Sequence, residues 1–169
     1  TTGYVYPWSH PHQATTVGNR TVTWDAAGRQ LLRKVGTTVE REIAAYNTYD
    51  LPLSGSVNGT PFAIDYTANG DRFRKTVGTG AEATTTTYFG ALYERRTSSE
   101  GVLDVFKVYA ETGLAAQIEM AGATTTTKVL VPDLAGSPGA MLTAGEEPTH
   151  FFYEPNGQRT TIAGNLMST

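Results

Sequence analysis

Apolar and polar residues alternate along most of this 169-residue chain in short runs separated by turn-forming residues. The clearest run is 114–120, where Leu114, Ala116, Ile118 and Met120 occupy every second position. A period of two is typical of a strand with one buried face and one face in water. No window shows a sustained helical period of 3.6 residues. The pattern therefore predicts an all-β fold.

The order of strand and turn signals predicts an antiparallel hairpin meander. Asn58-Gly59 lies between two alternating runs and is the strongest two-residue hairpin signal that a sequence offers. The expected strands are 17–24, 30–35, 39–46, 51–57, 60–66, 72–77, 84–89, 92–97, 103–109, 114–120, 125–131, 139–143 and 149–153. We expect an extended lead-in over residues 1–16, a sheet domain over 17–162 and a tail over 163–169.

One short pattern returns along the chain: an aromatic residue, an acid or amide, a short turn with Gly, and Arg. Its fullest copy is Trp-Asp-Ala-Ala-Gly-Arg at 24–29. The Asp side chain can accept a hydrogen bond from the backbone N–H two residues on, and Gly supplies a positive φ, so each copy is typical of a hairpin tip. The ring is expected to face inward, while the Arg covers the ring or pairs with the acid.

Further copies are predicted at 49–52, 65–72 and 153–159, with a related Asp-x-x-Gly-Ser-Pro turn at 133–138. We expect these repeat-turn residues to be structural. They are Trp24, Asp25, Gly28, Arg29, Tyr49, Asp50, Asp65, Tyr66, Gly70, Arg72, Asp133, Gly136, Ser137, Pro138, Tyr153, Gly157 and Arg159. Of these, Gly28, Gly70 and Gly157 should lie at hairpin ends with positive φ.

Composition and charge narrow the classes of partner. The net charge is −3 and Lys and Arg form no run, so neither nucleic acid nor an anionic membrane surface is indicated. The chain has no Cys, which excludes disulfides and thiolate metal sites. No apolar run approaches the roughly 20 residues of a membrane span. We expect no nucleic-acid partner, no membrane span and no cofactor.

Candidate catalytic and metal-binding residues are few. His10 and His12 lie on the same side of an extended segment, but a metal needs more ligands and His150 is far away in sequence. The acids that could form catalytic pairs are Asp25, Asp50, Asp65, Asp71 and Asp133. Each adjoins a turn, where binding backbone N–H groups explains it without catalysis. With no nucleophile-elbow, phosphate-loop or dinucleotide pattern present, the sequence predicts that the chain is not an enzyme.

The repeat turns, together with residues 131–138 and the closing 153–159, resemble the RHS/YD-repeat family, in the region that leads into its core. The Tyr-rich segments 88–94 and 106–109 fall where that family places similar hairpins, and a core-like end covers about 128–159. The resemblance implies a sheet that winds in a spiral into a hollow shell, as in insecticidal Tc toxins, polymorphic bacterial toxins and teneurins. Two departures are Val131, where the family often has His, and Leu-Pro at 51–52 in place of Gly-Arg.

The function implied by this resemblance is structural: a shell segment that encapsulates or displays a C-terminal toxin, in a bacterial protein that is secreted or on the cell surface. Its expected partners are the rest of a parent YD-repeat chain and an enclosed toxin polypeptide. Alone, the chain is expected to self-associate through unpaired strand edges. The alternative is an adhesion or carbohydrate-binding β-module, with the rings of Tyr4, Tyr6 and Trp8 exposed on a groove.

Self-cleaving members of the family carry an Asp-Pro-x-Gly motif shortly after the final YD-like turn. No carboxylate follows Glu154 in these residues. We therefore expect neither self-cleavage nor peptide hydrolysis.

Overall fold

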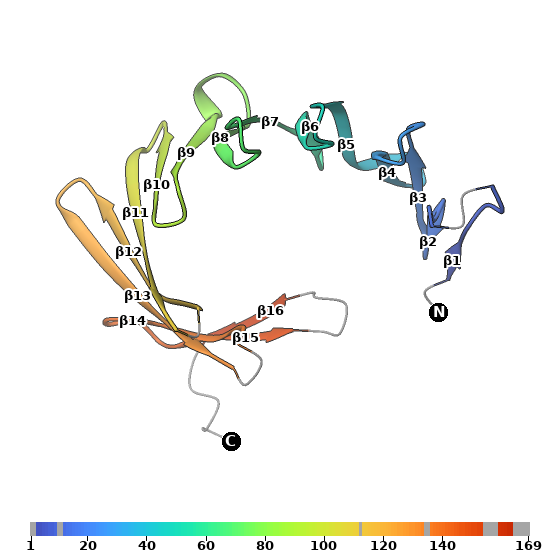
Figure 1. Cartoon of the computed structure of the whole chain (residues 1–169). Helices are drawn as coiled ribbons and strands as arrows, with labels where there is room; N and C mark the ends of the chain where they lie inside the picture. Colours follow the sequence, from blue (N-terminus) through green and yellow to red (C-terminus); the bar gives the residue numbers. More distant parts are fainter. Residues whose placement is uncertain (1–2, 10–11, 112, 134–135, 154–158, 164–169) are drawn as a thin grey trace. The chain divides into compact units, whose positions relative to one another are not determined.

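A computed structural model describes residues 3–9, 12–111, 113–133, 136–153 and 159–163 of the chain. It is all-β, and every strand lies next to the strands that precede and follow it in sequence (Figure 1). Among the described residues, the strand pairs with an assigned register are all antiparallel. The predicted fold class and the meander order are thus confirmed.

The chain divides into two compact units, Thr1–Thr86 and Thr87–Thr169, below called unit 1 and unit 2. Unit 1 contains β1 (Tyr4–Val5), β2 (Thr16–Val17), β3 (Arg20–Trp24), β4 (Gln30–Val35), β5 (Thr38–Tyr46), β6 (Pro52–Val57), β7 (Thr60–Tyr66), β8 (Arg72–Val77) and the short 3-10 helix η1 (Gly80–Glu82).

The division falls within β9 (Thr84–Phe89). The remaining strands belong to unit 2. They are β10 (Tyr93–Ser98), β11 (Gly101–Ala110), β12 (Gly113–Ala121), β13 (Thr124–Pro132), β14 (Pro138–Thr143), β15 (Thr149–Tyr153) and β16 (Arg159–Ala163).

Three features at the ends of the meander differ from the sequence predictions. The expected lead-in contains β1, which pairs with β2, so strand pairing begins before residue 17. The expected strand 17–24 is two strands, because the chain turns at Gly18, whose φ is 62°. The strand β16 was not predicted and pairs with β15.

The two-residue hairpin between β6 and β7 is as the sequence predicts. Asn58 and Gly59 have φ values of 51° and 80°. Positive φ at both central residues is the geometry that matches the right-handed twist of the flanking strands, and Asn-Gly adopts it readily. The turn sets the β6–β7 register, in which Val57 lies opposite Thr60.

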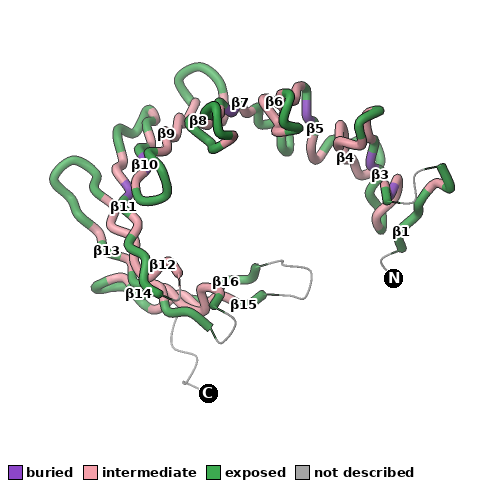
Figure 2. Tube along the Cα trace, in the orientation of Figure 1, coloured by how far each residue is buried: buried purple, intermediate pink, exposed green. Residues whose placement is uncertain are grey.

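The apolar core of unit 1 consists of single residues that recur on every second strand. Val22 on β3, Ile43 on β5 and Ile64 on β7 are buried (Figure 2). Beside Ile43, Gly55 on β6 lies so close to β5 that a Cβ there would stand 2.1 Å from the carbonyl oxygen of Glu42. Only Gly fits this contact, which lets two adjacent strands approach closely at the core.

In unit 2, the covered face of the sheet carries charged side chains. Val105 on β11 is 0% exposed, and Glu94, opposite it on β10, is 4% exposed. The Glu94 carboxylate accepts hydrogen bonds from Lys107 Nζ at 2.8 Å and from Arg96. Further across the same face, the Glu119 carboxylate accepts one from Lys128 Nζ at 2.7 Å. These partners satisfy carboxylates that would otherwise be costly to cover.

The opposite face of unit 2 is apolar and open, and we call it the apolar face. Rings of Phe89, Tyr93 and Phe106 stack along it, with centroids 5.0 and 4.8 Å apart. Residues directly opposite each other on neighbouring strands share a face, so the strand registers show which other residues of β10 to β16 belong to the apolar face. Its exposed large apolar residues are Phe89, Val102, Phe106, Val108, Met120, Val129, Val131, Leu142, Phe152 and Ile162.

This arrangement corrects the expectation for residues 114–120, which were predicted to have one buried and one wet face. Alternation is present, but residues 113–119 are half-buried on both faces. The polar side, with Gln117 and Glu119, is partly covered because it takes part in the Lys128 ion-pair cluster. The apolar side is partly open, and Met120 is exposed.

Candidate functional site

The first repeat turn shows the geometry of the turns that the sequence singled out. Asp25 Oδ1 accepts hydrogen bonds from the backbone N–H of Ala27 and of Arg29, both at 2.9 Å. The Gly28 N–H donates to the Asp25 carbonyl at 3.0 Å, and Gly28 has a φ of 86°. Hydrogen bonding from the Arg29 backbone N–H is the main reason that the pKa of Asp25 is lowered. The predicted capping by Asp and the positive φ of Gly28 are confirmed.

The second turn has the same geometry but lies three residues earlier than expected. Asn47 Oδ1 accepts from the N–H of Tyr49 at 2.9 Å and of Leu51 at 3.0 Å, so Asn47 corresponds to Asp25. Asp50 takes the place of Gly28 with a φ of 61°. Asp tolerates this left-handed region better than most residues, because its short side chain can hydrogen-bond locally. The aromatic residue of this copy is Tyr46, and Tyr49 is largely exposed.

Two later turns repeat the pattern. Thr67 Oγ1 accepts from the Asp71 N–H at 3.2 Å, and Asp133 Oδ1 accepts from the Ser137 N–H at 2.9 Å. The corresponding glycines, at positions 70 and 136, have φ values of 84° and 81°. The expected positive φ is therefore confirmed for Gly70, whereas Gly157 lies outside the described residues.

The aromatic residues that precede the second and third turns each form a hydrogen bond that no single turn explains. In unit 1, Tyr66 Oη donates to the Pro52 carbonyl at 3.0 Å, and Tyr46 Oη donates to the Gln30 carbonyl. Gln30 and Pro52 are each the first residue after the preceding repeat turn. The aromatic end of one repeat is thus fixed to the end of the turn in the repeat before it. We call this bond the aromatic staple.

Staples also occur at the start of unit 1 and in unit 2. Trp24 Nε1 donates to the Ala14 carbonyl at 3.0 Å, with the indole N–H in place of the Tyr hydroxyl. In unit 2, Tyr153 Oη donates to the carbonyl of Pro138, which again directly follows a repeat turn, at 3.0 Å. The Trp24 ring is thus half-buried against the segment before β2, as predicted, whereas Tyr153 remains 40% exposed and does not face inward.

Arg29 connects the first two turns. Its Nε lies 2.6 Å from Asp25 Oδ2, and its Nη1 lies 3.0 Å from Asp50 Oδ1. Its guanidinium carbon also stands 4.8 Å from the centre of the Tyr46 ring. The predicted Arg-acid pair is present, but the ring that Arg29 covers belongs to the following repeat. Burial is the main reason that the pKa of Tyr46 is raised.

The other predicted repeat-turn residues have separate positions. Asp65 lies within β7 and pairs with Arg74 at 2.7 Å. Arg72 begins β8 opposite Tyr66. Arg159 lies over the Phe151 ring at 4.9 Å, rather than over Tyr153. Sequence reasoning missed the roles of Tyr46, Asn47 and Thr67, although the aromatic positions 24, 46 and 66 recur at about 21 residues, the kind of period that marks a repeat.

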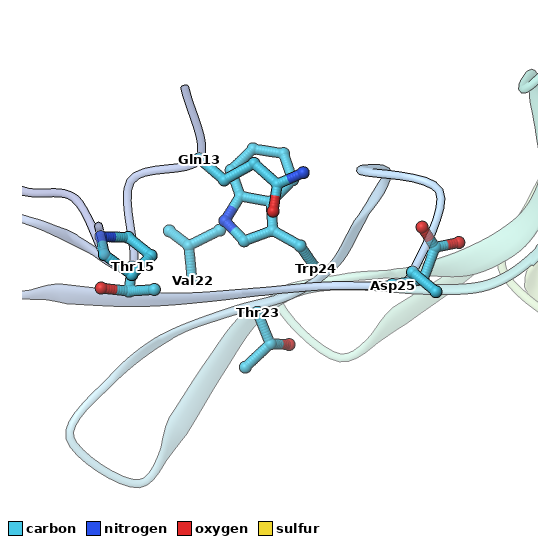
Figure 3. A pocket seen from close by; sticks show the side chains of 8 residues that line it. Gln13, Thr15, Val22, Thr23, Trp24 and Asp25 are labelled. Carbon is cyan, nitrogen blue, oxygen red and sulfur yellow. The ribbon is translucent and has the colours of Figure 1, made fainter. Parts of the chain in front are cut away.

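A shallow groove of about 570 Å³ lies beside the first repeat turn (Figure 3). The Trp24 indole and the Gln13 side chain lie close together there, with Val22 and Thr15 nearby (Figure 3). Pro7 also lines the groove, and its neighbours in sequence, Tyr6 and Trp8, are both exposed. Trp8 is 102% exposed, and the Tyr6 ring stacks on the Tyr4 ring with centroids 6.3 Å apart.

The described residues contain no cluster of three or more His, Asp or Glu side chains suited to a metal ion, and His10 lies outside them. Within the same ranges, no helix has the length and apolarity to cross a membrane. Comparison of the sequence with models of known protein families and with curated proteins finds no match.

Proposed function

We propose that this chain is a structural segment of a YD-repeat shell that encapsulates or displays a toxin polypeptide. The observation that supports this proposal is the aromatic staple, because in unit 1 it connects two successive repeats to the repeat before them by the same contact. Repeat proteins are stabilised by such contacts between neighbouring repeats, so repeats can be added one after another. A function based on enclosing or displaying another polypeptide needs this kind of extendable wall.

The arrangement of acids is also consistent with a structural role. Asp25, Asp133 and Asn47 use their side-chain oxygens to hold turns. Asp65 and Asp50 are in ion pairs with Arg side chains. These contacts account for the acids that the sequence offered as candidates for catalytic pairs, Asp71 apart.

The first and last strands of the sheet, β1 and β16, each have one neighbouring strand among the described residues. Their outer backbone groups can pair with further strands, which in the proposed shell belong to the rest of the parent chain. The chain alone should therefore form species that grow with concentration in sedimentation velocity experiments. A tight monomer at all concentrations, with a high melting temperature, would argue against the proposal.

The parent protein provides the more direct test. Its gene should encode a hypervariable segment after residue 169, and that segment should resist added protease until the shell is denatured. A gene that ends at residue 169, or a downstream segment that is cut as fast as an unfolded control, would refute the shell.

Binding of a glycan by unit 1 is a second candidate function, and the exposed rings favour it. Sugar-binding sites combine aromatic faces with a few polar groups, and here Trp8, Tyr6 and Tyr4 are exposed next to a groove that also contains the Gln13 amide. Pockets of roughly 300 to 1,000 Å³ are the usual size for small ligands. The groove lies within this range.

Intrinsic fluorescence can test glycan binding, because Trp8 and Trp24 are the only two tryptophans of the chain. Soluble polysaccharides that bind should change the emission, and Trp8→Ala should remove most of that change. Tyr49→Ala is the matched control, since Tyr49 is an exposed aromatic of unit 1 away from this groove. An unchanged spectrum across a panel of neutral and acidic polysaccharides would eliminate this candidate.

A further inference from the structure

We propose that the apolar face of unit 2 is a dimerisation surface that packs against the same face of a second copy of the chain. This inference does not rest on the proposed shell, because it concerns the face of the sheet, whereas the shell concerns its edges.

Charged and apolar side chains are distributed unusually between the two faces of unit 2. Charged Glu94, Lys107, Glu119 and Lys128 lie on the covered face, where their ion pairs satisfy them. Large apolar side chains lie on the open face instead. A sheet normally covers its apolar face and leaves its charged face in water. The reversed pattern indicates that the open face is covered in the functional state.

The apolar face is also large. Its ten exposed large apolar residues are between 39 and 52% exposed. Since a large apolar residue offers on the order of 150 to 200 Å², together they leave roughly 700 to 900 Å² open. The largest apolar patch of a typical monomer is about 300 to 600 Å². A standard protein interface buries about 800 Å² on each partner, so the face is large enough for a stable dimer.

The apolar face is self-complementary in charge, which a two-fold dimer requires because the same patch meets itself. Across β10 to β16, the described strand positions of the apolar face include just two charged residues, Arg95 and Asp104. They bind each other through two hydrogen bonds, of 2.7 and 3.1 Å. Two copies can therefore meet without bringing unpaired like charges together.

The shape of the apolar face also suits packing against a second sheet. Two twisted sheets pack face to face with their strands about 30° apart, and the side chains of the two inner faces interdigitate. On the apolar face, Val108, Ala116, Val129 and Leu142 form a row across four neighbouring strands. Small Ala116 lies between two larger valines, which leaves a hollow that a side chain of the second copy can fill.

Sedimentation equilibrium of three forms of the full chain tests the proposal. The unmodified chain should form a face-to-face dimer that dissociates on dilution and that grows further only through its strand edges. Val129→Lys puts a charge at the middle of the apolar face and should weaken the dimer by about 100-fold or more, since like charges that meet in an interface are strongly unfavourable. Thr124→Lys is the matched control on the same strand, exposed on the other face, and should leave the dimer unchanged.

Distance measurements between spin labels separate face packing from edge pairing and do not depend on the Lys variants. The chain has no Cys, so Thr127→Cys labels the apolar face alone and Thr124→Cys labels the opposite face alone. Packed sheets lie about 10 Å apart, so labels at residue 127 should give the shorter distances between copies. Similar distances from both sites, a dimer that tolerates Val129→Lys, or a chain that stays monomeric at its highest soluble concentration would each overturn the proposal.

Discussion

Removal of one aromatic staple should measurably destabilise unit 1. Tyr66→Phe deletes the hydroxyl that donates to the Pro52 carbonyl at 3.0 Å and leaves the ring in place. The net value of a hydrogen bond of this kind is about 1 kcal/mol. For a domain of about 60 to 100 residues, a loss of this size lowers the melting temperature by about 4 to 8 °C, and unit 1 falls within that range.

Tyr49→Phe is the control for this change, because Tyr49 lies in the same unit, is 70% exposed and loses the same oxygen. Its free energy of unfolding should stay within about 0.5 kcal/mol of the unmodified chain. Chemical denaturation gives the free energies of unfolding. Amide hydrogen exchange at Thr67 and Gly70 shows whether the loss of stability is local to the third repeat turn, since both N–H groups donate hydrogen bonds within that turn. If Tyr66→Phe is no less stable than Tyr49→Phe, the staple does not hold neighbouring repeats together.

Four other outcomes are expected. Gly55→Ala should cost about 2 to 3 kcal/mol in denaturant unfolding, because the new Cβ would overlap the Glu42 carbonyl oxygen and force β5 and β6 apart. Gly70→Val should cost about 1 kcal/mol or more in the same assay, since a β-branched residue tolerates a φ of 84° poorly. Burial raises the pKa of Glu94, but hydrogen bonds from Lys107 and Arg96 outweigh this effect, so the pKa is lowered. The free energy of unfolding should therefore fall as the pH drops below about 4.3, the pKa of Glu in the unfolded chain. Glu94→Gln should make the melting temperature depend less on pH in this acid range. Finally, the purified chain should neither cleave itself nor hydrolyse peptides. This prediction would be contradicted by fragments that accumulate with time on a gel and disappear when an Asp is mutated.

The sequence predicted the strands and the Asn58-Gly59 turn well because these depend on local signals. The second repeat turn was misplaced because Tyr49-Asp50 looks like the aromatic-acid pair of the first copy. In fact Asp50 occupies the Gly position, and the aromatic residue is Tyr46, which the spacing of about 21 residues alone could have indicated. The strand β1 is two residues long, too short to carry a period.

The covered and open faces of unit 2 could not be predicted for a different physical reason. Alternation shows which residues share a face, so Phe106 and Val108 are placed together from the sequence alone. It does not show which face is covered, because that depends on how the sheet bends and on what packs against it. The usual rule puts the apolar side of a sheet inward. In unit 2 the inward side carries charged Glu94 beside Val105, and both are buried.

The aromatic staple also determines how such a chain can change in length during evolution. In unit 1, the Tyr staples join the aromatic end of one repeat to the end of the turn in the repeat before it, and one repeat is two antiparallel strands. A duplication or deletion of about 21 residues therefore keeps the strand direction, the side that each residue faces and the partner of every staple. Insertion or deletion of a single strand would reverse the direction of every strand that follows it and would separate each Tyr hydroxyl from the carbonyl to which it donates. Recombination between gene copies should thus preserve whole hairpins, and related proteins should differ in length by multiples of this unit.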